Sequence, residues 1–135
     1  MNRREARELA FAIGFEKIIT GETVSSVIDG AEAVREIVVP AFSISLAEGV
    51  EQNEAAIDEK IAQNIRGWTL ERLPKVARSI LRLAIYEMCY SKETPVSVVI
   101  NEAVELAKTY GNTEDASFIN GVLSTVAKEL AGSDE

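Results

Sequence analysis

The sequence predicts an all-α fold of about seven helices joined by short connections. Along most of the 135 residues, apolar side chains recur at the three- and four-residue spacing of a helix face. No stretch alternates with period two for long enough to indicate a sheet. A third observation is that residues 68–90 are apolar around nearly the whole circumference of a helix. Such a helix has to be covered on several sides, so we expect the rest of the chain to pack around it.

The expected helices follow one another in chain order, with ends set by glycine, proline and capping residues. The first spans residues 2–19 and ends at Thr20-Gly21. Weaker signals predict a short helix closed by Asp29-Gly30 and another that Pro40 ends. The later helices are expected over residues 41–50, 54–65, a central helix with Pro74 in its first turn, 97–110 with Ser97 as N-cap, and 116–130 after a capping Asp115.

The length fits one domain, residues 1–135, with two lobes. We expect an N-terminal lobe over about residues 1–66, a C-terminal lobe over about residues 67–131, and a frayed tail over residues 132–135.

Composition excludes several classes of function. The chain has no histidine and a single cysteine, Cys89, which removes the common nucleophile triads and the commonest zinc ligands. Carboxylates lie at the spacings of solvated helix faces, so we expect no catalytic site, no metal, no cofactor and no enzyme activity. No apolar run approaches the roughly 20 residues of a membrane span, and no secretory signal is present, so we expect a cytoplasmic protein.

Arginines at the start of the first helix are the clearest binding candidates. Arg3, Arg4 and Arg7 fall in its first two turns, and a guanidinium can both pair with phosphate and stack on a base. The alternative is an ordinary charged helix end, because Glu5 and Glu8 lower the local field. The net charge of −8 argues against non-specific nucleic-acid binding, although a local basic patch can still attract a polyanion.

Two further groups of side chains could face a partner. Phe118 opens the last helix beside a polar loop, where it is either core or a stacking face. The charged residues of the central helix are what it can present to solvent or to a partner, namely Lys75, Arg78, Arg82 and Glu87.

Four blocks in the sequence resemble the successive signatures of the NusB family of transcription antitermination factors. These are WTLERLP from Trp68, LRLAIYE from Leu81, INEAVELAK from Ile100 and FINGVL from Phe118. The resemblance implies two small helical bundles that share long central helices. It also implies pairing with NusE, a ribosomal protein, and binding of single-stranded boxA RNA, so that RNA polymerase reads through terminators, notably in ribosomal RNA operons.

Carried over by position, the resemblance assigns RNA contact to Arg3, Arg4, Arg7 and Phe118. It places NusE near the central helix and the helix before it, where the candidates are Arg72, Lys75, Arg78 and Arg82. Glu5 and Glu8 dilute the family's basic N-terminus. With about three arginines on phosphates, the log–log salt slope on a single strand would be near −2, so tight binding would need the partner's help.

Two alternatives remain open at this stage. One is the RNA-recognition module of a ribosomal RNA methyltransferase, although the 135 residues leave no room for a cofactor-binding domain. The other is a helical scaffold that self-associates as a homodimer, with solvated arginines. Under the leading hypothesis we expect Arg7→Glu to weaken an RNA complex without unfolding the protein.

Overall fold

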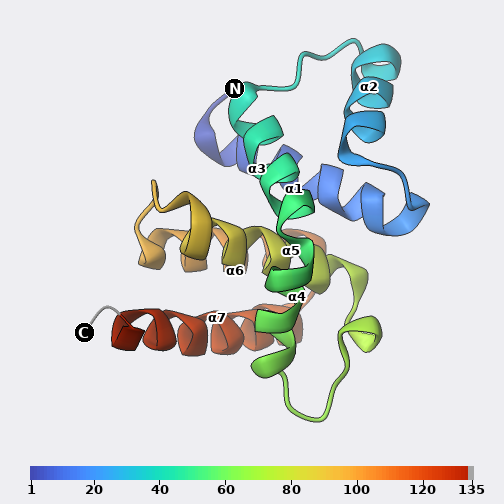
Figure 1. Ribbon diagram of the computed structural model, residues 1–135. Coiled ribbons are helices and arrows are strands. Elements are labelled where there is room, and N and C mark those ends of the chain that lie inside the picture. The colour runs from blue at the N-terminus through green and yellow to red at the C-terminus, as the bar shows by residue number, and fades with distance from the viewer. Residues whose placement is uncertain (134–135) are drawn as a thin grey trace.

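The computed structural model describes residues 1–133, and all regular structure in that range is helical (Figure 1). It contains seven α-helices in the described residues, which confirms the predicted fold class: α1 (Arg3–Thr20), α2 (Val24–Arg35), α3 (Ala41–Gln52), α4 (Glu54–Gln63), α5 (Lys75–Tyr86), α6 (Val96–Tyr110) and α7 (Thr113–Ser133). A 3₁₀ turn, η1 (Leu70–Arg72), precedes α5, and a π-helical turn, η2 (Glu87–Ser91), follows it.

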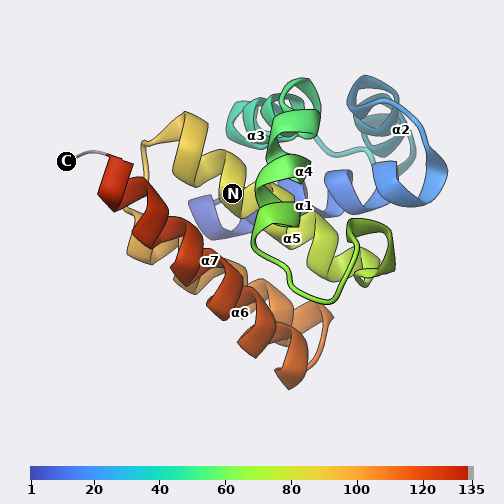
Figure 2. The same ribbon diagram turned by 60° about the horizontal axis from the view of Figure 1, so that its bottom comes forward.

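Helix α5 lies at the centre of the molecule, as its apolar circumference predicts. It contacts α1, α3, α4, α6 and α7, and Figures 1 and 2 show these helices on different sides of it. Ala77, Ile80 and Leu81 on this helix are completely buried. Each large apolar side chain removed from water in this way contributes about 1.5–3 kcal/mol to folding.

The apolar core is divided into two clusters of unequal size. The larger one lies around α5 and takes residues from every α-helix except α2. The smaller one joins α1, α2 and α3, and consists of Ile13, Val24, Val27, Ile28, Val39 and Ala47. Helices α1 and α3 contribute to both clusters, so they connect the two parts of the fold. The boundary between lobes near residue 66 stays a prediction.

The segment before Pro40 differs from the sequence prediction, because one helix, α2, stands where two short ones were expected. Thr23 caps it by accepting a hydrogen bond from the Ser26 N–H at 3.1 Å. Gly30 lies inside the helix, where its intrinsic preference for turns is overridden by burial of Val27 and Ile28 in the smaller cluster. Glu36 then ends α2 in the left-handed conformation, with φ of 53°.

The capping residues of α6 and α7 also differ from the prediction. Pro95, and not Ser97, occupies the N-cap of α6. Helix α7 begins at Thr113, three residues before the predicted start, because Asn112 and Asp115 cap it reciprocally: each backbone N–H donates to the other side chain, at 3.2 and 2.8 Å. The helix continues through Gly132 to Ser133, whereas the rest of the predicted tail, residues 134–135, lies outside the described residues.

A close approach between α3 and α5 explains the glycine in the middle of α3. A Cβ atom on Gly49 would lie 2.1 Å from the Cζ atom of Tyr86. Gly49 therefore lets the Tyr86 ring pack directly on the backbone of α3.

No helix within residues 1–133 is both long enough and apolar enough to cross a membrane.

Candidate nucleic-acid interface

The first turns of α1 place the three predicted arginines beside α3 and α6. Asn2 starts the helix, because its side-chain oxygen accepts a hydrogen bond from the Glu5 N–H at 2.8 Å. The Arg3, Arg4 and Arg7 side chains all line one open groove of about 300 Å³. The other residues lining it are Phe42, Glu93, Thr94, Val98 and Glu102.

Arg4 forms a two-pronged ion pair with Glu102 of α6. Its Nε and Nη2 atoms donate to the two carboxylate oxygens at 3.1 and 3.0 Å. The Arg4 side chain is 66% exposed, whereas that of Glu102 is only 16% exposed. The hydrogen bonds that Arg4 donates to Glu102 raise the pKa of Arg4 above its ordinary value, so the guanidinium stays charged.

Arg7 makes the same kind of pair in a very different environment. Its Nε and Nη2 atoms each donate to an oxygen of Glu87 at 2.9 Å. The two side chains are 7% and 2% exposed, so both charges are buried between α1 and the π-helical turn η2. This pairing gives Arg7 a structural part in holding α1 against η2, and a phosphate that used the same two donors would have to displace Glu87.

Arg3 has an aromatic partner instead of a carboxylate. Its guanidinium carbon lies 3.9 Å from the centroid of the Phe42 ring, a cation–π contact. Among the described residues Arg3 has no ion pair. Phe42, at the start of α3, was expected only as part of an apolar stripe; the structure makes it a half-buried wall of the arginine groove.

Phe118 lies elsewhere on the molecule. It is half-buried against the larger apolar cluster and lines two other grooves. One, of about 350 Å³, is also lined by Trp68, Leu73, Pro74, Asn112, Glu114 and Asp115. The other, of about 510 Å³, is also lined by Gln63, Asn64, Arg66 and the α7 residues Ser117, Gly121, Val122, Thr125 and Glu129. Neither groove includes Arg3, Arg4 or Arg7 within the described residues, so Phe118 and the arginines form separate surfaces.

The four candidates for partner binding differ in exposure: two are exposed and two are half-buried. Arg72, in η1, and Lys75, at the start of α5, are exposed. Arg78 is half-buried and donates from Nη2 to the carbonyl oxygens of Glu71 and Leu73, at 3.1 and 3.4 Å, which fixes the turn that leads into α5.

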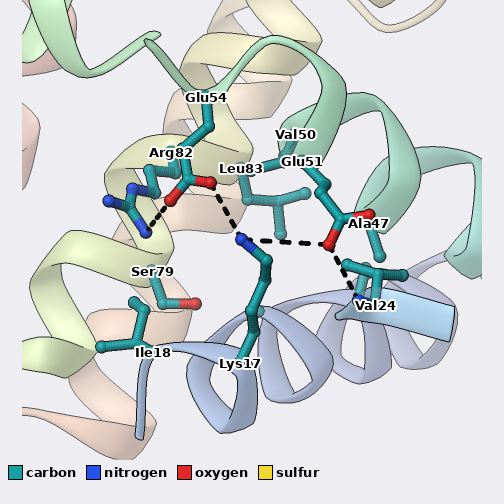
Figure 3. Close-up of a pocket in the computed structure, with 12 residues that line it drawn as sticks. Lys17, Ile18, Val24, Ala47, Val50, Glu51, Glu54, Ser79, Arg82 and Leu83 are labelled. Atoms are coloured by element: carbon teal, nitrogen blue, oxygen red, sulfur yellow. Dashed lines mark hydrogen bonds and ion pairs between the residues drawn. The ribbon is translucent and has the colours of Figure 1, made fainter. Parts of the chain in front are cut away.

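Arg82 belongs to an internal network of charges and not to the open surface. It donates to both oxygens of Asp58 at 2.8 and 2.9 Å, and its Nη1 atom lies 2.9 Å from Glu54. Figure 3 shows Glu54 between Arg82 and Lys17, with Lys17 in turn directed toward Glu51. The prediction that the charged residues of the central helix face solvent or a partner is therefore wrong for Arg82, which is 12% exposed, and for Glu87, which lies buried at the start of η2.

This network joins five helices but leaves no room for a ligand. The Nζ atom of Lys17 is 2.9 Å from Glu54 and 3.9 Å from Glu51, and Glu51 also accepts a hydrogen bond from the Val24 N–H at 2.9 Å. The cavity beside it has a volume of about 20 Å³, close to the minimum for one water molecule. The network of charges therefore serves to hold α1, α2, α3, α4 and α5 together.

Other reactive groups in the described residues do not form a site. No group of three or more His, Cys, Asp or Glu side chains within residues 1–133 is placed to hold a metal ion. Cys89 is half-buried, and burial raises the pKa of its thiol, so it is protonated near neutral pH.

Comparison with known proteins gives consistent matches over almost the whole chain. Residues 4–128 match the NusB family. The transcription antitermination protein NusB of Bacillus cereus strain B4264 is 47% identical over 135 aligned positions, and the match covers 96% of this chain and 100% of that protein. The NusB protein of Bacillus thuringiensis strain Al Hakam is 46% identical with the same coverage.

Solved structures match equally completely. T. maritima NusB superposes with a TM-score of 0.82 at 31% identity, covering 96% of this chain and 92% of that chain. A crystal structure of the antitermination factors NusB and NusE in complex with double-stranded RNA gives a TM-score of 0.84 at 26% identity, covering 94% of this chain and 96% of that chain.

Proposed function

This chain belongs to the NusB family of transcription antitermination proteins, and from that premise we propose that its arginine groove binds RNA jointly with NusE. The RNA would be a boxA-type element of a nascent transcript, notably from ribosomal RNA operons. The resulting complex would act on RNA polymerase in the cytoplasm. Antitermination factors act by binding, so membership of this family identifies the chain as a non-enzyme.

The observation that carries the proposal is the pairing of two outward-facing guanidinium groups with an aromatic wall in one groove. Arg3 is stacked on Phe42, and Arg4 is largely exposed at the same groove. A phosphate can take bidentate hydrogen bonds from such a guanidinium, and an unpaired base can stack on the plane of an arginine. The match to a NusB–NusE structure that contains RNA supports the same assignment.

The charges around the groove explain why a second protein would be needed. Arg7 is neutralised by Glu87, which leaves Arg3 and Arg4 as the arginines that can reach phosphates. Even with both arginines on phosphates of a single strand, the log–log salt slope would be no steeper than roughly −1.4. The whole chain also carries a net charge of −8 that repels a polyanion. The chain alone should therefore bind RNA weakly, and NusE would supply further contacts.

The NusE surface is proposed near η1 and the start of α5. Arg72 and Lys75 are exposed there and are free to meet a partner. Arg78 and Arg82 would act indirectly, because their hydrogen bonds hold η1, α4 and α5 in place.

The test is RNA binding by this chain with and without its cognate NusE. Fluorescence anisotropy with labelled boxA RNA and a scrambled RNA of equal length should show tight, sequence-selective binding only when NusE is present. Arg3→Glu should weaken the three-component complex and leave the fold intact, because the side chain lies at the groove. Equal binding of both RNAs by the pair would count against the proposal.

The structure changes the choice of variant. Arg7→Glu would place a second carboxylate against the buried Glu87, so it should unfold the protein and cannot report on RNA contact alone.

The other two hypotheses are less well supported. The relatives that match over their whole length are antitermination proteins, not methyltransferases. Self-association as a homodimer remains testable by size-exclusion chromatography with light scattering, with and without RNA.

A further inference from the structure

We propose that Glu102 sets the RNA affinity of the arginine groove, because in the free protein it occupies the face of Arg4 that an RNA phosphate takes in the complex. The inference rests on the proposed RNA-binding function, since it requires a phosphate to enter the groove. From its spacing on α6, Glu102 looks like an ordinary residue of a solvated helix face. The proposal makes it a competitor of the RNA phosphate for Arg4.

The geometry of the pair is that of phosphate recognition. The Nε and Nη2 atoms of Arg4 donate two roughly parallel hydrogen bonds to the two oxygens of one carboxylate, at 3.1 and 3.0 Å. A guanidinium offers a phosphate the same pair of donors at similar distances. One fork can hold one anion at a time, so a phosphate that uses it has to displace Glu102.

Exposure makes that exchange possible for Arg4 and not for Arg7. The Arg4 side chain is 66% exposed, so water surrounds the guanidinium when either anion leaves. Exposed ion pairs of this kind contribute little to folding. Glu102 is 16% exposed and is held by α6 at the edge of the groove, so it stays near Arg4 as a tethered competitor.

The few charges around the groove give Glu102 a large influence on its RNA affinity. The carboxylates that line the groove are Glu93 and Glu102, while Arg7 is already neutralised by the buried Glu87. Within the described residues Arg3 makes no ion pair, so in the free protein it is the groove arginine without a carboxylate partner. Removing the charge of Glu102 would raise the number of groove arginines without an ion pair from one to two, with Glu105 as a further carboxylate that acts on Arg4.

The test is the isosteric variant Glu102→Gln in complex with NusE, with boxA RNA titrated at several salt concentrations. We expect binding about two- to fivefold tighter than for the native chain, in line with the strength of an exposed ion pair. We also expect the log–log salt slope to become more negative by roughly 0.7, because one more net positive charge meets the strand. Loss of the charge alone would shift the slope equally in an Arg4→Gln background, whereas loss of competition requires Arg4.

The matched control is Glu22→Gln, which changes the net charge equally. Glu22 is exposed just beyond the other end of α1, whose last residue, Thr20, lies about 24 Å along the helix from Arg4. That distance exceeds the Debye length of about 8 Å at physiological salt, so RNA affinity should be unchanged.

Two results would overturn the inference. Unchanged or weaker binding by Glu102→Gln would mean that Glu102 is neutral or positions Arg4 for the phosphate. A gain of the same size in an Arg4→Gln background would mean that the effect does not pass through Arg4. If Glu102→Gln proves less stable to heat, Glu102→Asp replaces it: the charge is kept but drawn back from Arg4, and tighter binding than native is again required.

These outcomes can be told apart from failure of the proposed function. If the native chain with NusE does not prefer boxA RNA to scrambled RNA, the function itself is wrong. If the native pair shows that preference and neither Glu102 variant binds more tightly, the competitor role alone is wrong.

Discussion

Arg4 and Arg7 lie about one turn apart on α1 and make nearly identical ion pairs, yet only the pair of Arg4 is open enough to exchange its carboxylate for another anion. Each arginine donates from Nε and Nη2 to both oxygens of one glutamate, at distances between 2.9 and 3.1 Å. Arg4 is 66% exposed, whereas Arg7 and Glu87 are both below 10%. The difference teaches that burial, and not residue type or position in a motif, decides whether an arginine is free to change partners.

The physical reason is the cost of leaving a charge alone. In water, a guanidinium that loses its carboxylate is hydrated at once, so little free energy is at stake. In the interior, a charge whose partner is removed keeps its desolvation penalty without the compensating attraction. The buried pair therefore holds α1 to α5 and η2, and the exposed pair is available for binding.

The largest expected effect is on stability, through the buried pair. Glu87→Ala should lower the free energy of unfolding by about 3–5 kcal/mol, because Arg7 would be left buried and unpaired. Urea denaturation followed by circular dichroism measures it. The double variant Arg7→Met/Glu87→Leu should recover most of the loss, since no buried charge remains. A loss below about 1 kcal/mol for Glu87→Ala would contradict the proposed difference between the buried and the exposed ion pair.

An intermediate effect is expected where burial is intermediate. Arg82 is 12% exposed and its partners Asp58 and Glu54 are 23% and 30% exposed. Arg82→Met should lower the free energy of unfolding by about 1–3 kcal/mol, because the two carboxylates keep some contact with water. The same urea experiment applies, with the exposed Arg72→Met as the control that should match the native chain. A loss equal to that of Glu87→Ala would mean that the contribution of these ion pairs to the free energy of unfolding does not depend on their exposure.

A smaller effect is expected on binding through Arg3. Arg3→Lys keeps the charge but loses the planar group that lies 3.9 Å above the Phe42 ring, so RNA affinity in the NusE complex should fall about two- to fivefold. Phe42→Leu should cause a similar loss, and the double variant should lose no more than either alone. Fluorescence anisotropy measures all three. Fully additive losses would show that the two side chains act independently.

The smallest expected effect is on stability through the exposed pair. Arg4→Gln should leave the urea midpoint of the native chain essentially unchanged while it weakens RNA binding in the NusE complex, because the pair with Glu102 is open to water. A fall in midpoint comparable to that of Glu87→Ala would show that the two pairs are equivalent after all.

Much of the fold could be predicted from local patterns. The helical spacing of apolar residues gave the all-α class, and the apolar circumference of residues 68–90 indicated the central position of α5, which the structure confirms. Errors appeared where local signals compete with packing. Gly30 indicated a helix end, but burial of its neighbours carries α2 past it.

The candidate site was only partly predictable. The three arginines were found by their spacing, but their partners were not, because Arg4 and Glu102 are 98 residues apart and Arg7 and Glu87 are 80 apart. Phe42 was missed for the same reason, since nothing near it in the sequence links it to Arg3. One signal was available for Glu87: a lone carboxylate between apolar residues of a helix that must be covered on several sides needs a buried partner.

The sequence by itself determined that the chain is helical, which helix is central, and which family the chain resembles, because periodicity and motif order are properties of neighbouring residues. Only the tertiary structure decided that Arg7 and Arg82 are internal, that Arg3 rests on Phe42, and that Arg4 is shared between Glu102 and the solvent. Those outcomes depend on how much water each charge keeps, and that is set when helices distant in the sequence pack together.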